Sequence, residues 1–189
     1  MNIGLYFGSF NPIHVGHLII ASCAAEHPDL DRVWMVVTPQ NPHKPEAALL
    51  NEYDRLHLVR LGIGDDTRLR ASDAEFSLPR PSYTIDTLTY LCEKYPEHAF
   101  KIIMGSDSLQ NLPRWKNAKL ILEQFSIFVY ERPGFPVVTY PGANITVFDA
   151  PILNISATAV RDLIKTGHSI RYLVPEPVRE EIERSRHYR

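Results

Sequence analysis

Apolar and polar residues along this chain follow two periods, one typical of strands and one typical of helices. Short runs rich in β-branched and aromatic residues are followed by longer segments whose apolar residues recur at helical spacing. The segments with strand character are residues 2–7, 32–38, 68–71, 100–104, 126–130 and 145–148. The segments with helical character are residues 15–26, 52–63, 84–95, 157–166 and 177–184, with a further helical stretch after Gly105.

This order predicts an α/β fold with a Rossmann-like doubly wound sheet, mostly parallel, and helices on both faces. Parallel strands need crossover connections, and the alternating helices supply them. Ligands in such folds bind outside the carboxyl ends of the strands, so the loops that follow the strands are where functional residues are expected.

Composition narrows the class of protein. A chain of 189 residues, 44% hydrophobic and 22% charged, is expected to form a single domain over residues 1–189. A net charge of -2 and a pI near 6.4 do not favour binding to nucleic acid or to an anionic membrane. No apolar run approaches the roughly 20 residues of a membrane span, and no secretory leader is visible, so we expect a soluble, cytoplasmic protein. Cys23 and Cys92 fall in apolar helical segments and are expected to be small buried residues, not disulfide partners or metal ligands.

The strongest local pattern follows the first strand and runs from Gly8 to His17. Gly8 allows a sharp turn, and Pro12 restricts how the next helix begins. His14 and His17 are three residues apart, so on a helical turn both imidazoles lie on one side, and Gly16 between them leaves room for a ligand. A phosphate at this helix N-terminus would meet free backbone N–H groups and the positive end of the helix dipole. Either histidine alone is more often a helix cap or a surface residue, but the pair favours phosphate binding.

A second pattern lies near the end of the chain, where Ser156, Thr158 and Arg161 open a predicted helix. Hydroxyls at a helix start can cap it or donate to phosphate oxygens, and Arg161, one turn further, can reach the same anion. The alternative is an ordinary capped helix with a surface arginine.

A third cation, Lys44, lies in a polar, proline-rich loop over residues 39–45. Such a lysine is either solvated or folds over a phosphate when substrates bind, since a loop can move in this way more easily than a helix.

Together these motifs resemble the nucleotidyltransferase superfamily with the His-x-Gly-His signature. In that superfamily both histidines contact the phosphates of a nucleoside triphosphate, and an Ile-Ser-x-Thr-x-x-Arg stretch grips the β and γ phosphates. The resemblance therefore implies that helices from about residue 156 complete an ATP site. The implied ATP-binding residues are Gly8, Ser9, Phe10, His14, His17, Ser156, Thr158 and Arg161, and the implied catalytic residues are His14, His17, Lys44 and Arg161. Asn11 departs from the Asp found in many members, which puts a carboxylate role there in doubt.

The middle and the end of the chain resemble bacterial nicotinate mononucleotide adenylyltransferase. The matching stretches are residues 81–88, 104–109, 112–115 and 169–175. The resemblance implies an enzyme of NAD biosynthesis that transfers the adenylyl group of ATP to nicotinate mononucleotide and releases pyrophosphate, with Mg²⁺ accompanying ATP. It places Gly105 and Asp107 beside the adenosine. It also implies that the pyridine mononucleotide is bound by Ser82, Tyr83, Thr84, Trp115 and Lys44.

Other interpretations stay open. Trp115 could stack on an electron-poor pyridine ring or pack as a rim aromatic, and residues 82–84 could be only a helix cap. The chain could adenylylate another phosphate acceptor, such as phosphopantetheine, or could be a non-catalytic nucleotide-binding sensor. The sequence does not decide between nicotinate and nicotinamide mononucleotide, or whether the chain forms a homo-oligomer.

Overall fold

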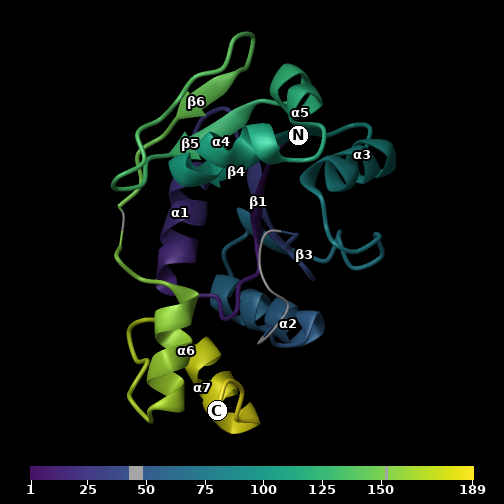
Figure 1. Ribbon diagram of the computed structural model, residues 1–189. Helices are drawn as coiled ribbons and strands as arrows, with labels where there is room; N and C mark the ends of the chain where they lie inside the picture. The colour runs from purple at the N-terminus through teal and green to yellow at the C-terminus, as the bar shows by residue number, and fades with distance from the viewer. Residues whose placement is uncertain (43–48, 152) are drawn as a thin grey trace.

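The computed structural model describes residues 1–42, 49–151 and 153–189 (Figure 1). Its strands are β1 (Asn2–Gly8), β2 (Arg32–Val37), β3 (Leu69–Ser72), β4 (Ala99–Gly105), β5 (Ile127–Tyr130) and β6 (Ile145–Val147). Its helices are α1 (Val15–Ala25), α2 (Glu52–Ile63), α3 (Thr84–Lys94), α4 (Ser106–Asn111), α5 (Ala118–Gln124), α6 (Ala157–Lys165) and α7 (Glu176–Ser185), with a 3₁₀ turn at Leu112–Arg114.

The strands of the described chain form one sheet in the order β3-β2-β1-β4-β5-β6, and every neighbouring pair is parallel. The predicted doubly wound α/β fold is confirmed, and within these residues the sheet is entirely parallel. From β1 the chain builds outward to β2 and β3, then returns to the other side of β1 with β4. The strand order therefore reverses between β1 and β4, and this switch point is where a sheet of this kind opens a crevice at its carboxyl edge.

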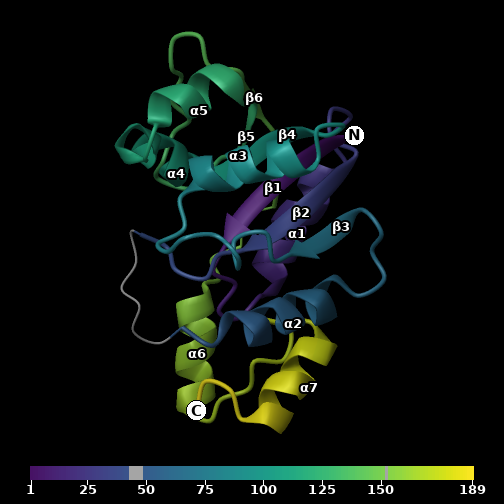
Figure 2. The same ribbon diagram turned by 90° about the vertical axis from the view of Figure 1, so that its right-hand side faces the viewer.

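Both faces of the sheet are buried, because consecutive strand positions are apolar and alternate between two cores. In β2, Val33, Met35 and Val37 join one core cluster, while Trp34 and Val36 join the other. Helices α1 and α2 pack on the first face, and α3, α4 and α5 cover the second. Figures 1 and 2 show α1 and α3 on opposite sides of the strands.

The C-terminal segment returns to the beginning of the chain. Val160 of α6 and Val178 of α7 are buried in the same core cluster as Val59 of α2. The backbone N–H of Val15, at the start of α1, donates to the carbonyl of Leu173 over 3.0 Å. Figure 2 shows α6 and α7 beside α2, at the end of the molecule away from the N-terminus. The last two helices are thereby brought to the loop that follows β1.

Two features differ from the sequence-based expectation. The sequence pattern does not predict α5, because a helix of seven residues is too short to display a clear helical period. The expectation that Cys92 is buried is wrong, since Leu88 and Leu91 occupy the core side of α3 and the next residue is exposed; Cys23 is only partly buried. No helix in the described part of the chain combines the length and apolar character that crossing a membrane requires.

Candidate active site

A cleft of about 650 Å³ lies at the carboxyl ends of the central strands. The sequence-predicted site residues that the structure describes all line it: Gly8, Ser9, Phe10, His14, His17, Ser82, Tyr83, Thr84, Gly105, Asp107, Trp115, Ser156, Thr158 and Arg161. Lys44, the remaining predicted residue, lies outside the described residues. The fold therefore brings four separate parts of the sequence to one cavity.

The two histidines stack on each other at the start of α1. His14 is the N-cap and His17 the third residue of the helix, and their ring centroids are 3.6 Å apart with planes inclined by 21°. The backbone N–H of His14 donates to Nδ1 of His17 over 3.3 Å. A neutral ring that accepts at Nδ1 carries its proton on Nε2, so His17 offers an N–H donor at Nε2.

His14 is almost fully buried, and its protonation follows from that burial. Desolvation lowers the pKa of His14 to about 4, because a low-dielectric surrounding disfavours the imidazolium. At pH 7 the ring is therefore neutral. Its Nδ1 is buried and has no hydrogen-bond partner among the described residues. Buried polar atoms normally have a partner, so an unpartnered one in a cleft wall is suited to bonding with a ligand.

The expectation of free backbone N–H groups at the start of α1 is wrong for two of them. The N–H of Val15 donates to Leu173, and the N–H of His17 donates to the carbonyl of His14, each over 3.0 Å. The returning C-terminal segment takes the first donor, and the turn itself takes the second. The imidazoles, not these two amides, are thus the donors that the turn presents to an anion.

Phe10 packs against the turn that carries the two histidines. Its backbone has a φ of 44°, which is unusual for a side chain of this size. Its ring lies edge-on to His17 at a centroid distance of 5.0 Å. A Cβ on Gly8 would come within 2.7 Å of the same ring, so Gly8 leaves the space that Phe10 occupies.

Helix α6 reaches the histidine loop through Arg161. Nη1 of Arg161 donates to the carbonyl of Asn11 over 2.7 Å, and Nη2 donates to the hydroxyl of Thr158 over 3.1 Å. Ser156 caps α6, since its Oγ accepts the N–H of Ala159 over 3.1 Å. The Asn11 side chain accepts the N–H of Leu50 over 3.1 Å, so this residue ties two loops together without a negative charge.

The end of β4 forms another wall of the cleft. A Cβ on Gly105 would meet Asp107 at 2.5 Å and Arg132 at 2.9 Å, so a side chain there would displace both. Arg132 follows β5, and its Nη1 lies 3.7 Å from Oδ2 of Asp107. Its backbone N–H donates to Oγ of Ser106 over 2.8 Å. Arg132 is not among the sequence-predicted residues, because it has no motif around it beyond a following proline and glycine.

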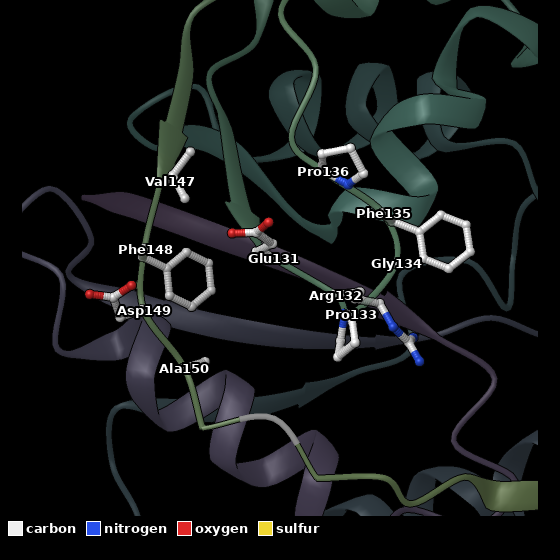
Figure 3. Close-up of a pocket in the computed structure, with 10 residues that line it drawn as sticks. All are labelled: Glu131, Arg132, Pro133, Gly134, Phe135, Pro136, Val147, Phe148, Asp149 and Ala150. Atoms are coloured by element: carbon white, nitrogen blue, oxygen red, sulfur yellow. The ribbon is translucent and has the colours of Figure 1, made fainter.

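A second cavity, of about 490 Å³, lies beside this wall and shares Arg132 with the cleft. It is formed by the segments that follow β5 and β6 and is lined by Glu131, Arg132, Pro133, Gly134, Phe135, Pro136, Val147, Phe148, Asp149 and Ala150 (Figure 3). Figure 3 shows the Phe148 ring directed between the two segments, while the Phe135 ring points away.

The start of α3 and the turn after α4 form the opposite end of the cleft. Tyr83, Thr84 and Trp115 are all partly buried there. Lys116 lies with Nζ 4.9 Å from the centre of the Tyr83 ring and forms an ion pair with Asp86 at 2.8 Å. This end therefore combines two aromatic rings with a partly neutralised cation, which suits a flat, polar ring.

The chain matches the model of the cytidylyltransferase-like family over residues 5–163. A protein of Cytophaga hutchinsonii named "Probable nicotinate-nucleotide adenylyltransferase" is 51% identical, and the match covers 100% of this chain and 98% of that protein. A protein of Flavobacterium johnsoniae with the same name is 49% identical, with 100% of both chains covered. The chain belongs to the nicotinate-nucleotide adenylyltransferase family.

The fold of this family member is also found in more distant solved structures. Plasmodium falciparum nicotinic acid mononucleotide adenylyltransferase complexed with NaAD superimposes with a TM-score of 0.81 at 18% identity, covering 99% of this chain and 97% of that one. The same enzyme complexed with APC gives a TM-score of 0.81 at 19% identity, covering 99% and 96%. At this identity the likeness establishes a shared fold.

Arg55 is a buried residue of α2 that supports the loops of the cleft, and it is not among the sequence-predicted residues. Only 1% of it is exposed. Its guanidinium donates to four carbonyl groups, those of Ser9, Thr38, Pro39 and Leu50, over 2.6, 2.8, 3.1 and 2.8 Å. Arg55 precedes the buried Leu58 and Val59 by three and four residues, so it lies on the apolar face of α2. A charged residue on an apolar helix face is the sequence signal that could have identified it.

Replacing Arg55 with Met keeps much of the apolar stem and removes all four hydrogen bonds. We expect the free energy of unfolding in urea to fall by about 3 kcal/mol or more, because buried carbonyls lose their donors. Arg60→Met, at an exposed position of the same helix, is the matched control and should change it by less than about 1 kcal/mol. Equal effects in the two variants would contradict the bracing role of Arg55.

The low pKa of His14 predicts a pH-dependent stability. Its folded-state pKa of about 4 lies below the unfolded value near 6.5. The folded state accepts only the neutral ring of His14, so it is fully stable above about pH 6.5. It loses stability as pH falls toward 4, because the unfolded chain takes up a proton at His14 that the folded chain does not. Relative to His14→Gln, the unchanged protein should lose about 3 kcal/mol of unfolding free energy between pH 7 and pH 4. Parallel urea unfolding of both proteins at the two pH values measures this, and identical losses would refute it.

Proposed function

We propose that the chain transfers the adenylyl group of ATP to nicotinate mononucleotide, forming nicotinate adenine dinucleotide and pyrophosphate. The observation that carries the proposal is the single cleft, in which the stacked histidines and Arg161 lie together with Tyr83 and Trp115. Relatives of that name at 51% and 49% identity over the whole chain support the same activity. NAD biosynthesis in the cytoplasm is the corresponding cellular role.

The triphosphate of ATP is proposed to lie between the β1–α1 loop and the start of α6. Donors converge there from both sides: the neutral imidazole of His14, the imidazole of His17, and the guanidinium of Arg161. Arg161 already contacts the carbonyl of Asn11, so it sits directly above the histidine loop. On this arrangement residues 1–189 act as one domain, with the helices from about residue 156 completing the ATP site.

The two nucleoside ends then occupy opposite walls. The adenosine is proposed to lie at the end of β4, where Gly105 leaves room for the side chains of Asp107 and Arg132 and Asp107 can accept from ribose hydroxyls. The pyridine ring is proposed to lie against Trp115, with the start of α3 at Ser82, Tyr83 and Thr84 receiving its carboxylate. The proposed contact of Lys44 with a phosphate is carried by the sequence alone.

Catalysis on this arrangement is positioning and charge stabilisation. A phosphate oxygen of the mononucleotide attacks the α-phosphorus of ATP in line. As this P–O bond forms, the bond between the α-phosphorus and the oxygen that bridges it to the β-phosphorus breaks, and pyrophosphate leaves with the bonding electrons. The attacking oxygen is already anionic, so no general base is needed. Two imidazole donors and Arg161 stabilise negative charge that grows on the transferred and leaving phosphates, without reorganising during the step.

Magnesium fits the cleft as an ion that accompanies ATP. The carboxylates that line the described cleft are Glu75, which is buried against Thr87, and Asp107, which faces Arg132. No group of three acidic, histidine or cysteine side chains suited to a metal ion occurs in the described part of the chain. Such a donor set suits a Mg²⁺ ion held mainly by phosphate oxygens and water, where it would neutralise charge on the triphosphate.

The direct test is to incubate the protein with ATP and Mg²⁺ and, separately, nicotinate mononucleotide, nicotinamide mononucleotide or phosphopantetheine. We expect dinucleotide and an equal amount of pyrophosphate with nicotinate mononucleotide, and no pyrophosphate without an acceptor. ATP binding without product would identify a nucleotide sensor, and product with phosphopantetheine alone would identify a different transferase. Either result would overturn the proposal.

Replacement of His17 with Ala tests the role of the histidine pair. The variant should lower kcat by about 100-fold or more, the scale of losing one transition-state donor. Its melting temperature should stay close to that of the unchanged protein. His57→Ala, at an exposed position of α2, is the control and should keep full activity. Normal turnover by the His17 variant would remove the proposed role.

A further inference from the structure

Glu75 is a buried carboxyl group that the mechanism above does not use. It lies between β3 and α3, borders the cleft and is 2% exposed. Its Oε1 accepts a hydrogen bond from the hydroxyl of Thr87 over 2.8 Å. Its Oε2 is buried and has no hydrogen-bond partner in the described part of the chain. Burying a carboxyl group in this way opposes folding, so its place in the cleft wall suggests a functional role.

The groups around Glu75 are hydroxyls from separate chain segments. Thr38 follows β2, Ser82 precedes α3, and Thr87 lies in α3, and all three are buried. Burial raises the pKa of Glu75, and the hydroxyls of Thr87, Thr38 and Ser82 act in the opposite direction by favouring the carboxylate. Thr87 is thus the hydrogen-bond donor to Glu75, and the hydroxyls of Thr38 and Ser82 lie near the same carboxyl group.

These segments are themselves tied to the strand ends. The N–H of Thr38 donates to the carbonyl of Gly8 over 2.9 Å, and the N–H of Ser82 donates to the carbonyl of Gln40 over 3.0 Å. Ser82 is followed directly by Tyr83, which lines the cleft. A shift of Glu75 would therefore reach Tyr83, at the start of α3, through Ser82 alone.

The hydroxyl network is not fully satisfied, as a purely structural brace would be. Oε2 of Glu75 and Oγ of Ser82 are both buried without a partner among the described residues, although Ser82 is near enough to influence the pKa of Glu75. Polar networks that serve stability normally satisfy every member, because each unpaired buried atom is unfavourable.

We propose that Glu75 is a positioning residue for the mononucleotide end of the cleft, and that its carboxyl group fixes the start of α3 by gathering the hydroxyls of Thr38, Ser82 and Thr87. The proposal rests on the proposed function, since it takes Tyr83 and Thr84 as contacts of the acceptor. Glu75 acts through these residues and makes no contact with the reacting atoms.

Glu75→Gln tests the proposal, because it keeps the size of the side chain and turns one acceptor into a donor that faces hydroxyls. We expect KM for nicotinate mononucleotide to rise about 10-fold or more, with KM for ATP and kcat changed less than about 2-fold. The melting temperature at pH 8 should be unchanged or higher, since a buried charge is removed. Glu93→Gln, the same substitution at an exposed position of α3, should change none of these values.

A second variant and a second measurement keep the test decisive. Thr87→Val removes the donor to Oε1 at similar volume and should also raise KM for the mononucleotide several-fold; it decides the matter if Glu75→Gln does not fold. Mononucleotide binding measured by Trp115 fluorescence should weaken in parallel in both variants, with Trp115→Phe identifying the contribution of the other tryptophan.

Three results would overturn the role of Glu75: unchanged KM for the mononucleotide, an equal rise in both KM values, or a lower melting temperature with unchanged binding. An inactive unchanged protein would instead overturn the proposed function, and the proposal for Glu75 with it. If the unchanged protein is active and both variants bind the mononucleotide normally, only the proposal for Glu75 fails.

Discussion

The cleft depends on a buried guanidinium that bonds to backbone instead of to an acid. Arg55 joins the loops after β1 and β2 to the segment before α2, and all four of its described acceptors are carbonyl oxygens. Loops that converge at a strand edge leave carbonyls pointing inward, and these need donors once water is excluded. A planar group with five fixed donors can satisfy several of them at once, which a lysine in the same place cannot do. The positions of Ser9 and Thr38 in the cleft wall follow from this one side chain.

Charge in the cleft is local and unevenly compensated, in a protein whose net charge is -2. Lys116 is partly neutralised by Asp86, and Arg132 faces Asp107. Arg161 differs, because its described partners are a carbonyl and a hydroxyl, which leave its positive charge uncancelled. Among the described residues that line the cleft, the arginine without an acidic partner therefore lies between α6 and the histidine loop, where burial also keeps His14 neutral. Anion binding here needs no positive field over the whole molecule.

The sequence predicts those parts of the structure that have a local pattern. The alternation of strand and helix is enough for the sheet and its helices, and the spacing of His14 and His17 is enough to place both imidazoles on one side of a turn. Arg55 and Glu75 lack such a pattern, since each is a single charged residue whose partners come from other segments. The bond from the N–H of Val15 has no local pattern either, because its acceptor, Leu173, is far away in the sequence. Sequence reasoning thus reaches the residues that define a motif and misses those that hold the motif in place through tertiary contacts.

The hydrogen bond between Val15 and Leu173 has a consequence for how the molecule forms during synthesis. The carbonyl of Leu173, which accepts the N–H of Val15 at the start of α1, is synthesised well after β6, the last strand of the sheet. Domains fold as units when their chain emerges from the ribosome. The nascent sheet therefore exposes an unfinished histidine turn and the apolar side of α2 until α6 and α7 arrive. A growing chain of this protein therefore cannot form the complete cleft until residues 157–185 have been synthesised.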